Sequence, residues 1–136
     1  ALLAARRNPL IRLRYELSDS KREELVVMGA RMFPHPIHEG YDPQVFAVVD
    51  RVDDQPVKSL AHLVELIRAA EGEFITFHLA GKYETLVFPR QEMFDITESI
   101  LEDEGIRYQY SKDLADAWEK DPNDQKNGAG DAKAKE

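Results

Sequence analysis

Residues 48–63 read VVDRVDDQPVKSLAHL, which sets out a strand, a turn and the start of a helix in that order. The apolar, β-branched run from Gln44 to Val52 predicts the strand. Residues 53–56 (DDQP) predict the turn, because aspartate can bond its own backbone and proline resists strand continuation. Ser59 is the expected helix N-cap, since its hydroxyl can accept from a first-turn N–H. Helical spacing follows in the apolar residues Leu60, Leu63, Val64, Leu66, Ile67 and Ala70.

The residues after this helix predict a β-hairpin and a second helix. Apolar and polar residues alternate over 74–79, Gly81 marks a turn, and 83–88 read as the partner strand. Residues 90–104 again have helical spacing, and Gly105 is expected to end that helix. A short mixed segment follows, with Leu114 and Trp118 as the expected packing anchors.

The N-terminal side of the chain predicts two more strands. Residues 9–17 alternate apolar and charged side chains, which is typical of a strand with one buried face. Residues 24–28 form a short apolar run closed by Gly29, which indicates a second strand. Residues 32–43 contain three prolines, so we expect a loop or a short extended piece rather than regular helix.

Composition limits the classes of protein that this chain can belong to. Its 136 residues suffice for one domain, and a hydrophobic content of 43% excludes wholesale disorder. A net charge of −8 disfavours nucleic acid as a partner, and no apolar run approaches the ~20 residues of a membrane helix. The chain has no cysteine, which excludes disulfides, thiolate metal sites and cysteine nucleophiles. Because it starts with Ala1 and no signal peptide is visible, we interpret it as a fragment of a longer protein.

We expect one α+β domain over residues 1–118, with its core at about 9–114. In residues 119–136 alanine is the only apolar residue type, among Lys, Asp, Asn and Gly. Such a segment cannot bury enough surface to offset the entropy of ordering it, so we predict a disordered polar tail.

The order strand, turn, capped helix and hairpin resembles a PDZ domain of the Deg/HtrA serine proteases, closest to the second, C-terminal PDZ domain of the plant-type Deg subgroup. Asp53-Asp54 stands where that family usually has Asn-Gly, and Gly40-Tyr41 matches a Gly-Tyr that precedes the strand. The helix Leu60–Ile67 is similar to Leu-x-x-Leu-x-x-x-Ile-Glu, and Gln109–Leu114 is similar to a Met-Ser-x-Asp-Leu ending. The resemblance covers residues 24–114 and implies a PDZ-like small antiparallel β-barrel or sandwich with two main helices.

Two motifs of that family are missing. No Gly-Leu-Gly-Phe loop, whose N–H groups would hold a peptide carboxylate, precedes Val45, and the nearest stretch, 30–34, ends in Pro34, which has no N–H. No serine lies in the Gly-Asn-Ser-Gly-Gly context of a trypsin-like nucleophile. The resemblance therefore implies a non-catalytic interaction domain whose parent protein is a serine endopeptidase, serving oligomer assembly or regulation of substrate access.

The expected partner is a protein or peptide, such as a neighbouring PDZ or protease domain of the same assembly, with homo-oligomers formed through the parent protein. We expect no cofactor and no metal. An exported bacterial parent of the Deg type would place the domain in the periplasm or cell envelope. The alternative is a free-standing adaptor that binds internal peptide segments with no protease attached.

The resemblance also implies a groove between the second strand and the first long helix, where a peptide adds as a strand. The candidate groove residues are Met28, Met32, Phe33, His62 and Leu66. The alternative interpretation is that the apolar members of this set, with Leu63, are simply core.

Three other groups of residues carry competing interpretations. His35 and His38 could bind a metal, but zinc needs three or four ligands, so partly exposed loop histidines are the simpler interpretation. The acidic second helix, with Glu98 and Glu102, could perform carboxylate catalysis if a pocket held them, could face a basic partner, or could be solvated. The arginines at the N-terminal end could attract polyanions, keep a strand face soluble or contact an upstream domain; they are Arg6, Arg7, Arg12 and Arg14.

Overall fold

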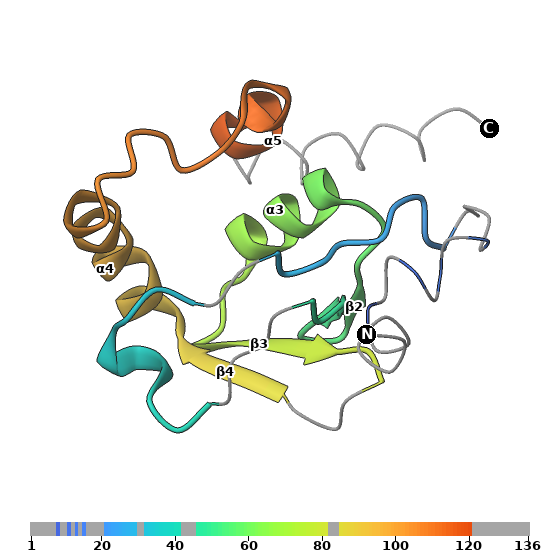
Figure 1. Ribbon diagram of the computed structural model, residues 1–136, viewed down its shortest axis with the longest axis horizontal. Coiled ribbons are helices and arrows are strands. Elements are labelled where there is room, and N and C mark those ends of the chain that lie inside the picture. The colour runs from blue at the N-terminus through green and yellow to red at the C-terminus, as the bar shows by residue number, and fades with distance from the viewer. Residues whose placement is uncertain are drawn as a thin grey trace, which may run out of the picture.

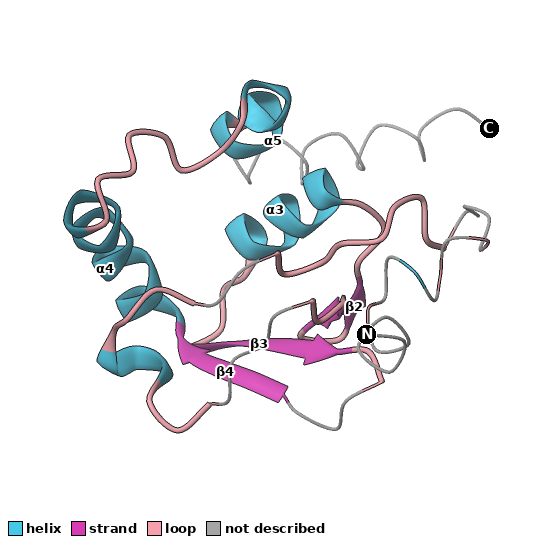
Figure 2. Ribbon diagram, viewed as in Figure 1, coloured by secondary structure: helices cyan, strands magenta, loops and turns pink. Residues whose placement is uncertain are grey.

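The computed structural model describes residues 8, 11, 13, 15, 21–29, 32–41, 46–81 and 85–120. Its centre is an antiparallel sheet in the order β2-β1-β3-β4 (Figures 1 and 2). The strands are β1 (Val49–Val52), β2 (Gln55–Pro56), β3 (Phe74–Leu79) and β4 (Thr85–Pro89). An antiparallel sheet together with helices confirms the predicted α+β class. Within the described ranges the sheet is open, so closure into a barrel is not observed.

In the part of the chain that the structure describes, three α-helices accompany the sheet: α3 (Leu60–Ala69), α4 (Arg90–Asp103) and α5 (Ala115–Glu119). Helix α3 packs over one face of the sheet, and α5 packs against α3 (Figure 1). Two 3₁₀ turns, η1 (Pro36–His38) and η2 (Lys112–Leu114), complete the described elements. None of the helices in these ranges is both long and apolar enough to cross a membrane.

Local sequence explains where α3 begins. The N–H of His62 donates to the hydroxyl of Ser59 at 3.1 Å, which confirms the predicted N-cap. A carboxylate oxygen of Glu24 accepts from the N–H of Leu60 at 3.1 Å, so a second free N–H of the first turn is also satisfied. The acceptor charge lies at the positive end of the helix dipole, where it is favourable.

The core lies between α3 and the sheet. Ile75 on β3 has no exposed surface and Val52 on β1 is 2% exposed. The other buried members of this cluster are Val26, Ala47, Val49, Val57, Leu79, Leu86 and Phe88. Since residues from every strand except the short β2 contribute, burial of these apolar side chains fixes both the sheet register and the position of α3.

Most of the predicted N-terminal strand, residues 9–17, lies outside the described residues. Of these residues the structure describes only Ile11, Leu13 and Tyr15, and none of the three lies in a strand. The N–H of Ile11 donates to the carbonyl of Asn8 at 3.1 Å. Alternation of side chains predicted the wrong local structure at these positions because a period of two is only a local signal.

Other predicted elements are shorter than expected. Of the strand predicted over 44–52, residues 44 and 45 lie outside the described residues, and β1 begins at Val49, three residues after Phe46 with its left-handed φ of 59°. The predicted strand at 24–28 is a single bridge between Val27 and Val48. The proline-rich residues form one 3₁₀ turn, η1, with Pro36 in its first position.

The C-terminal half follows the prediction closely. The hairpin, the second helix and the packing of Leu114 are confirmed, and Gly105 has the positive φ of 66° that suits glycine after a helix. Glu119 is the last residue of α5. The rest of the predicted tail, residues 121–136, lies outside the described residues.

Candidate peptide-binding surface

Residues 23–28 are held between β1 and the start of α3. The N–H groups of Glu23 and Glu24 both donate to the carbonyl of Lys58, at 2.9 and 2.8 Å. At the other end of the segment, Met28 donates to Ala47 at 2.9 Å. Figure 1 shows this segment passing along α3. The segment therefore joins the β1 side of the sheet to the N-terminal end of α3.

Only one edge of this segment is used in the described structure. The carbonyl of Val26 accepts from Val49 at 2.9 Å, and the carbonyl of Met28 accepts from Phe46 at 2.7 Å. Alternate residues of a strand point their peptide groups to opposite sides, so those of Leu25 and Val27 face away from β1. Between residues that the structure describes, the backbone groups of Leu25 and Val27 make no hydrogen bond.

Three of the five candidate groove residues pack on the core. Met28, Met32 and Leu66 are half-buried, and each packs against the core cluster. Leu63 does the same, which agrees with the alternative in which these side chains contribute to the core. A half-buried side chain can contribute to the core and also line a groove, since its inner part packs on the core while its outer part faces solvent.

The remaining two candidates differ from these. His62 lies in the first turn of α3, where its Nδ1 accepts from the N–H of Lys58 at 3.2 Å. This contact assigns the proton of the neutral ring to Nε2, which is then a hydrogen-bond donor. Phe33 is 42% exposed, and its carbonyl contacts Nε2 of His38. Phe33 is thus an exposed aromatic residue near η1 and, unlike Met28, Met32 and Leu66, does not pack against the core cluster.

The two loop histidines serve η1 itself. Nδ1 of His35 accepts from the N–H of Ile37 at 3.1 Å, and Nε2 of His38 accepts from the N–H of His35 at 3.1 Å. Together they form a capping box around this short turn. No group of three or more His, Asp or Glu residues in the described ranges is placed to hold a metal ion.

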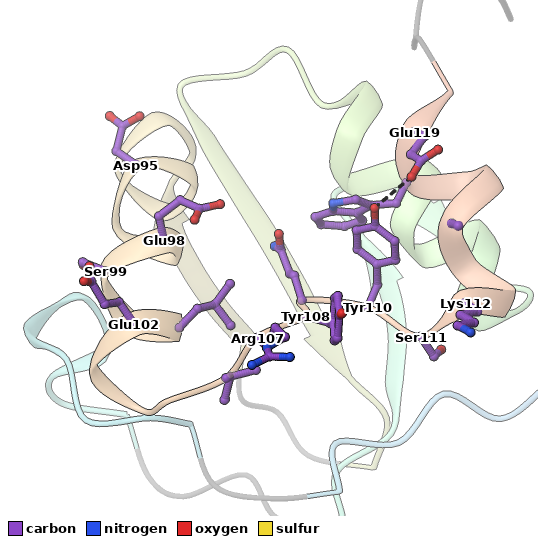
Figure 3. Close-up of a pocket in the computed structure, with 15 residues that line it drawn as sticks. Asp95, Glu98, Ser99, Glu102, Arg107, Tyr108, Tyr110, Ser111, Lys112 and Glu119 are labelled. Carbon is purple, nitrogen blue, oxygen red and sulfur yellow. Dashed lines mark hydrogen bonds between the residues drawn. The ribbon is translucent and has the colours of Figure 1, made fainter.

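A separate open cavity of about 1170 Å³ lies between α4 and α5 (Figure 3). Glu98 and Glu102 of α4 line it, and Glu119 lies on the opposite side. Both α4 carboxylates belong to exposed residues, and no described hydrogen bond joins either of them to a nucleophile. The pocket that carboxylate catalysis would require is therefore present, but both carboxylates lie exposed at its wall and are not buried within it.

The aromatic side of this cavity was not foreseen from the sequence. The hydroxyl of Tyr110 donates to Glu119 at 3.1 Å, and this hydrogen bond raises the pKa of Tyr110 above its usual value. The Tyr110 and Trp118 rings lie 5.6 Å apart, and the guanidinium of Arg68 lies 5.8 Å from the centroid of Trp118. The available signal was three aromatic residues within 108–118 next to acidic ones.

A scan against protein families matches residues 3–113 to the PDZ domain family. No curated protein matches the chain. The family match spans the sheet, α3, α4 and the surface built from residues 23–28.

Proposed function

The chain belongs to the PDZ domain family, and on that premise we propose that it binds an extended polypeptide by adding it as a strand beside α3. PDZ domains are protein-interaction modules that bind peptides or proteins, and they are generally non-catalytic. Strand addition supplies affinity through main-chain hydrogen bonds, while apolar side chains at alternate positions supply specificity.

The observation that carries the proposal is the state of the strand edges. The edge at β4 is closed at Val87, because the hydroxyl of Tyr41 bonds both backbone groups of that residue. The edge at β2 is only two residues long and contains Pro56, which has no N–H to donate. Among the described residues this leaves the outward peptide groups of Leu25 and Val27 as the edge that can receive a strand.

The neighbouring side chains suit an extended apolar ligand. Met28 supplies an adaptable and Leu66 a branched apolar side chain, and both are half-buried. An apolar ligand side chain that packs on them is itself removed from water, which is favourable. His62 adds a polar donor at Nε2 in the first turn of α3. We infer that these residues and Met32, with Phe33 at the rim, select the ligand.

The ligand is inferred to be an internal segment rather than a free C-terminus. Capture of a terminal carboxylate needs several convergent N–H groups, and glycine-rich loops provide them in other PDZ domains. The sequence has no such loop before Val45, and Pro34 removes one N–H from the nearest stretch.

We further infer that the domain is the C-terminal PDZ domain of a Deg/HtrA-type serine endopeptidase and serves oligomer assembly or control of substrate access. The resemblance over residues 24–114 supports this parent, and no catalytic serine motif lies in the chain itself. The alternative remains a free-standing adaptor with the same peptide-binding edge.

Peptide binding can be tested on the full chain with a display library of random ten-residue peptides, in free-acid and amidated forms. We expect selected peptides to bind equally in both forms and to shift the NMR signals of residues 24–28 and α3. Val27→Pro removes one outward N–H without touching a described backbone hydrogen bond, and should weaken binding by about tenfold.

Variants of α3 give the matched control. His62→Ala should weaken binding, whereas Glu65→Ala, on the same helix at a position outside its apolar spacing, should not. Peptides that bind only as free acids, or shifts confined to the α4–α5 cavity, would contradict the proposed mode. Circular dichroism of each variant separates lost binding from lost folding.

The proposed parent has its own test. Sequencing the coding DNA upstream of Ala1 should reveal a trypsin-like domain with a Gly-Asn-Ser-Gly-Gly loop. A start codon within a few residues would instead establish the adaptor. In either case the isolated chain should not hydrolyse casein, and hydrolysis that persisted through purification would refute a non-catalytic domain.

A further inference from the structure

The cavity between α4 and α5 is lined by both apolar and acidic side chains. Its apolar and aromatic lining consists of Leu101, Ile106, Tyr108, Tyr110, Ala115 and Trp118. Its acidic lining consists of Asp95, Glu98, Glu102 and Glu119. Arg107 and Lys112 are the basic residues on the lining, so the carboxylates outnumber them.

Figure 3 shows how these groups are arranged. Glu98 extends from α4 toward the cavity, and Tyr110 and Glu119 lie across from it. Tyr108, on the segment between the helices, is 76% exposed, which is high for so large a side chain. Exposed aromatic rings beside carboxylates favour a ligand that is cationic and partly apolar, since guanidinium groups stack on rings and pair with carboxylates.

The chain itself contains a segment with this chemistry. Residues 6–14 read RRNPLIRLR, with four arginines, no acidic residue and three large apolar residues; we term this the arginine segment. Of its described apolar residues, Leu13 is half-buried and Ile11 is 44% exposed, so apolar surface at Ile11 remains uncovered in one copy of the chain. The C-terminal residues 121–136 do not complement the charge of the acidic cavity, because they contain four acidic residues and only three lysines.

We propose that the arginine segment of one copy docks in the α4–α5 cavity of a second copy. Arginines of the segment pair with Glu98 and Glu102, and its leucines and isoleucine cover Tyr108 and Ile106. Reciprocal docking of two copies gives a closed dimer, and one-way docking gives an open chain of copies.

This self-association uses a different surface from peptide binding beside α3. Residues 24–28 and His62 do not line the cavity, so Val27→Pro and His62→Ala should leave the association unchanged. Failure of one proposal therefore leaves the other intact.

The test is sedimentation equilibrium of the full chain over a range of concentrations. The wild type should form dimers or larger species that weaken as salt is raised, because exposed charge pairs are screened. Glu98→Lys with Glu102→Lys should weaken the association by at least about tenfold. The control is Asp103→Lys with Glu104→Lys, which makes the same charge change on exposed residues outside the cavity lining and should alter it by less than about twofold.

A complementary pair of variants tests the partner segment. Arg12→Glu with Arg14→Glu should also abolish self-association, since the carboxylates would face like charges. Mixing this variant with Glu98→Lys/Glu102→Lys should restore association, because one chain still has the arginines and the other still has the acidic cavity.

Several results would overturn the proposal. A wild-type chain that is monomeric at every concentration would refute it. The occupant of the cavity would then be another protein or the arginine segment of the same copy. An equal loss in the Asp103/Glu104 control, or no restoration on mixing, would also refute it. Circular dichroism establishes that each variant is folded before it is scored.

Discussion

The hydroxyl of Tyr41 makes both backbone hydrogen bonds of Val87, accepting from its N–H at 3.0 Å and donating to its carbonyl at 3.1 Å. These two residues are 46 positions apart in the chain. The Tyr41 ring also meets the ring of Phe88 edge-on, with centroids 5.7 Å apart. One side chain thus occupies the outer edge of β4 and ties the η1 loop to the sheet, which keeps that edge from pairing with another strand.

Tyr41→Phe should therefore have two effects. It removes two hydrogen bonds while keeping the ring against Phe88, so we expect the free energy of unfolding to fall by about 1–2 kcal/mol. It also leaves the backbone groups of Val87 available to another strand, so the variant should aggregate more readily. Urea unfolding and light scattering measure the two effects. Tyr108→Phe is the control, because no described hydrogen bond involves the Tyr108 hydroxyl, and it should change neither.

The cap of α3 gives a second prediction. Ser59→Ala removes the acceptor of the His62 N–H and should lower the free energy of unfolding by about 1 kcal/mol. Ser59→Asp should retain most of the stability, because its carboxylate can accept the same bond. Thermal unfolding of both variants is the measurement. Equal losses in the two would show that Ser59 acts through something other than capping.

Much of the fold could be predicted from the sequence because local signals decide it. Ser59 precedes helical apolar spacing, and alternation on either side of Gly81 predicts the β3–β4 hairpin. The turn at Asp53 shows how a departure from the family pattern is accommodated. Asp53 adopts a left-handed φ of 49°, a conformation for which the family usually has asparagine at this position. Its carboxylate accepts from the N–H of Thr76 at 2.9 Å, and this hydrogen bond stabilises the left-handed conformation.

The parts that could not be predicted depend on contacts between distant residues. Nothing local in residues 36–41 indicates that Tyr41 would close the edge of β4. Apart from His62, the candidate groove residues were apolar, and the half-burial of Met28 and Leu66 follows from that character. Apolarity alone could not separate these from Phe33, whose exposure is set by the fold of the η1 loop.

The contact between α3 and α5 leads to a third prediction. The guanidinium of Arg68 lies over the Trp118 ring and also donates to the carbonyl of Lys120 at 3.2 Å. A double-mutant cycle with Arg68→Met and Trp118→Leu should give a coupling energy of about 0.5–1 kcal/mol. Urea unfolding of the four proteins provides it. Additive losses would mean that the two side chains stabilise α5 independently.

The hydrogen bond between Tyr110 and Glu119 leads to a prediction about pH. It raises the pKa of Tyr110 in the folded chain, so folding favours the protonated phenol. The resulting stabilisation is fully present below the pKa of the unfolded chain, about 10, and is lost as pH rises through the higher folded value. Glu119→Gln removes the charged acceptor and should lower the pKa of Tyr110 toward the ordinary value.

The measurement is an NMR titration of the ring carbon of Tyr110 that bears the hydroxyl, in the wild type and in Glu119→Gln. Asp116→Asn is the matched control, because it removes a charge from the same helix without touching the hydrogen bond. It should leave the titration of Tyr110 nearly unchanged. A shift as large as that of Glu119→Gln would mean that the general negative charge of α5, rather than the one hydrogen bond, controls the phenol.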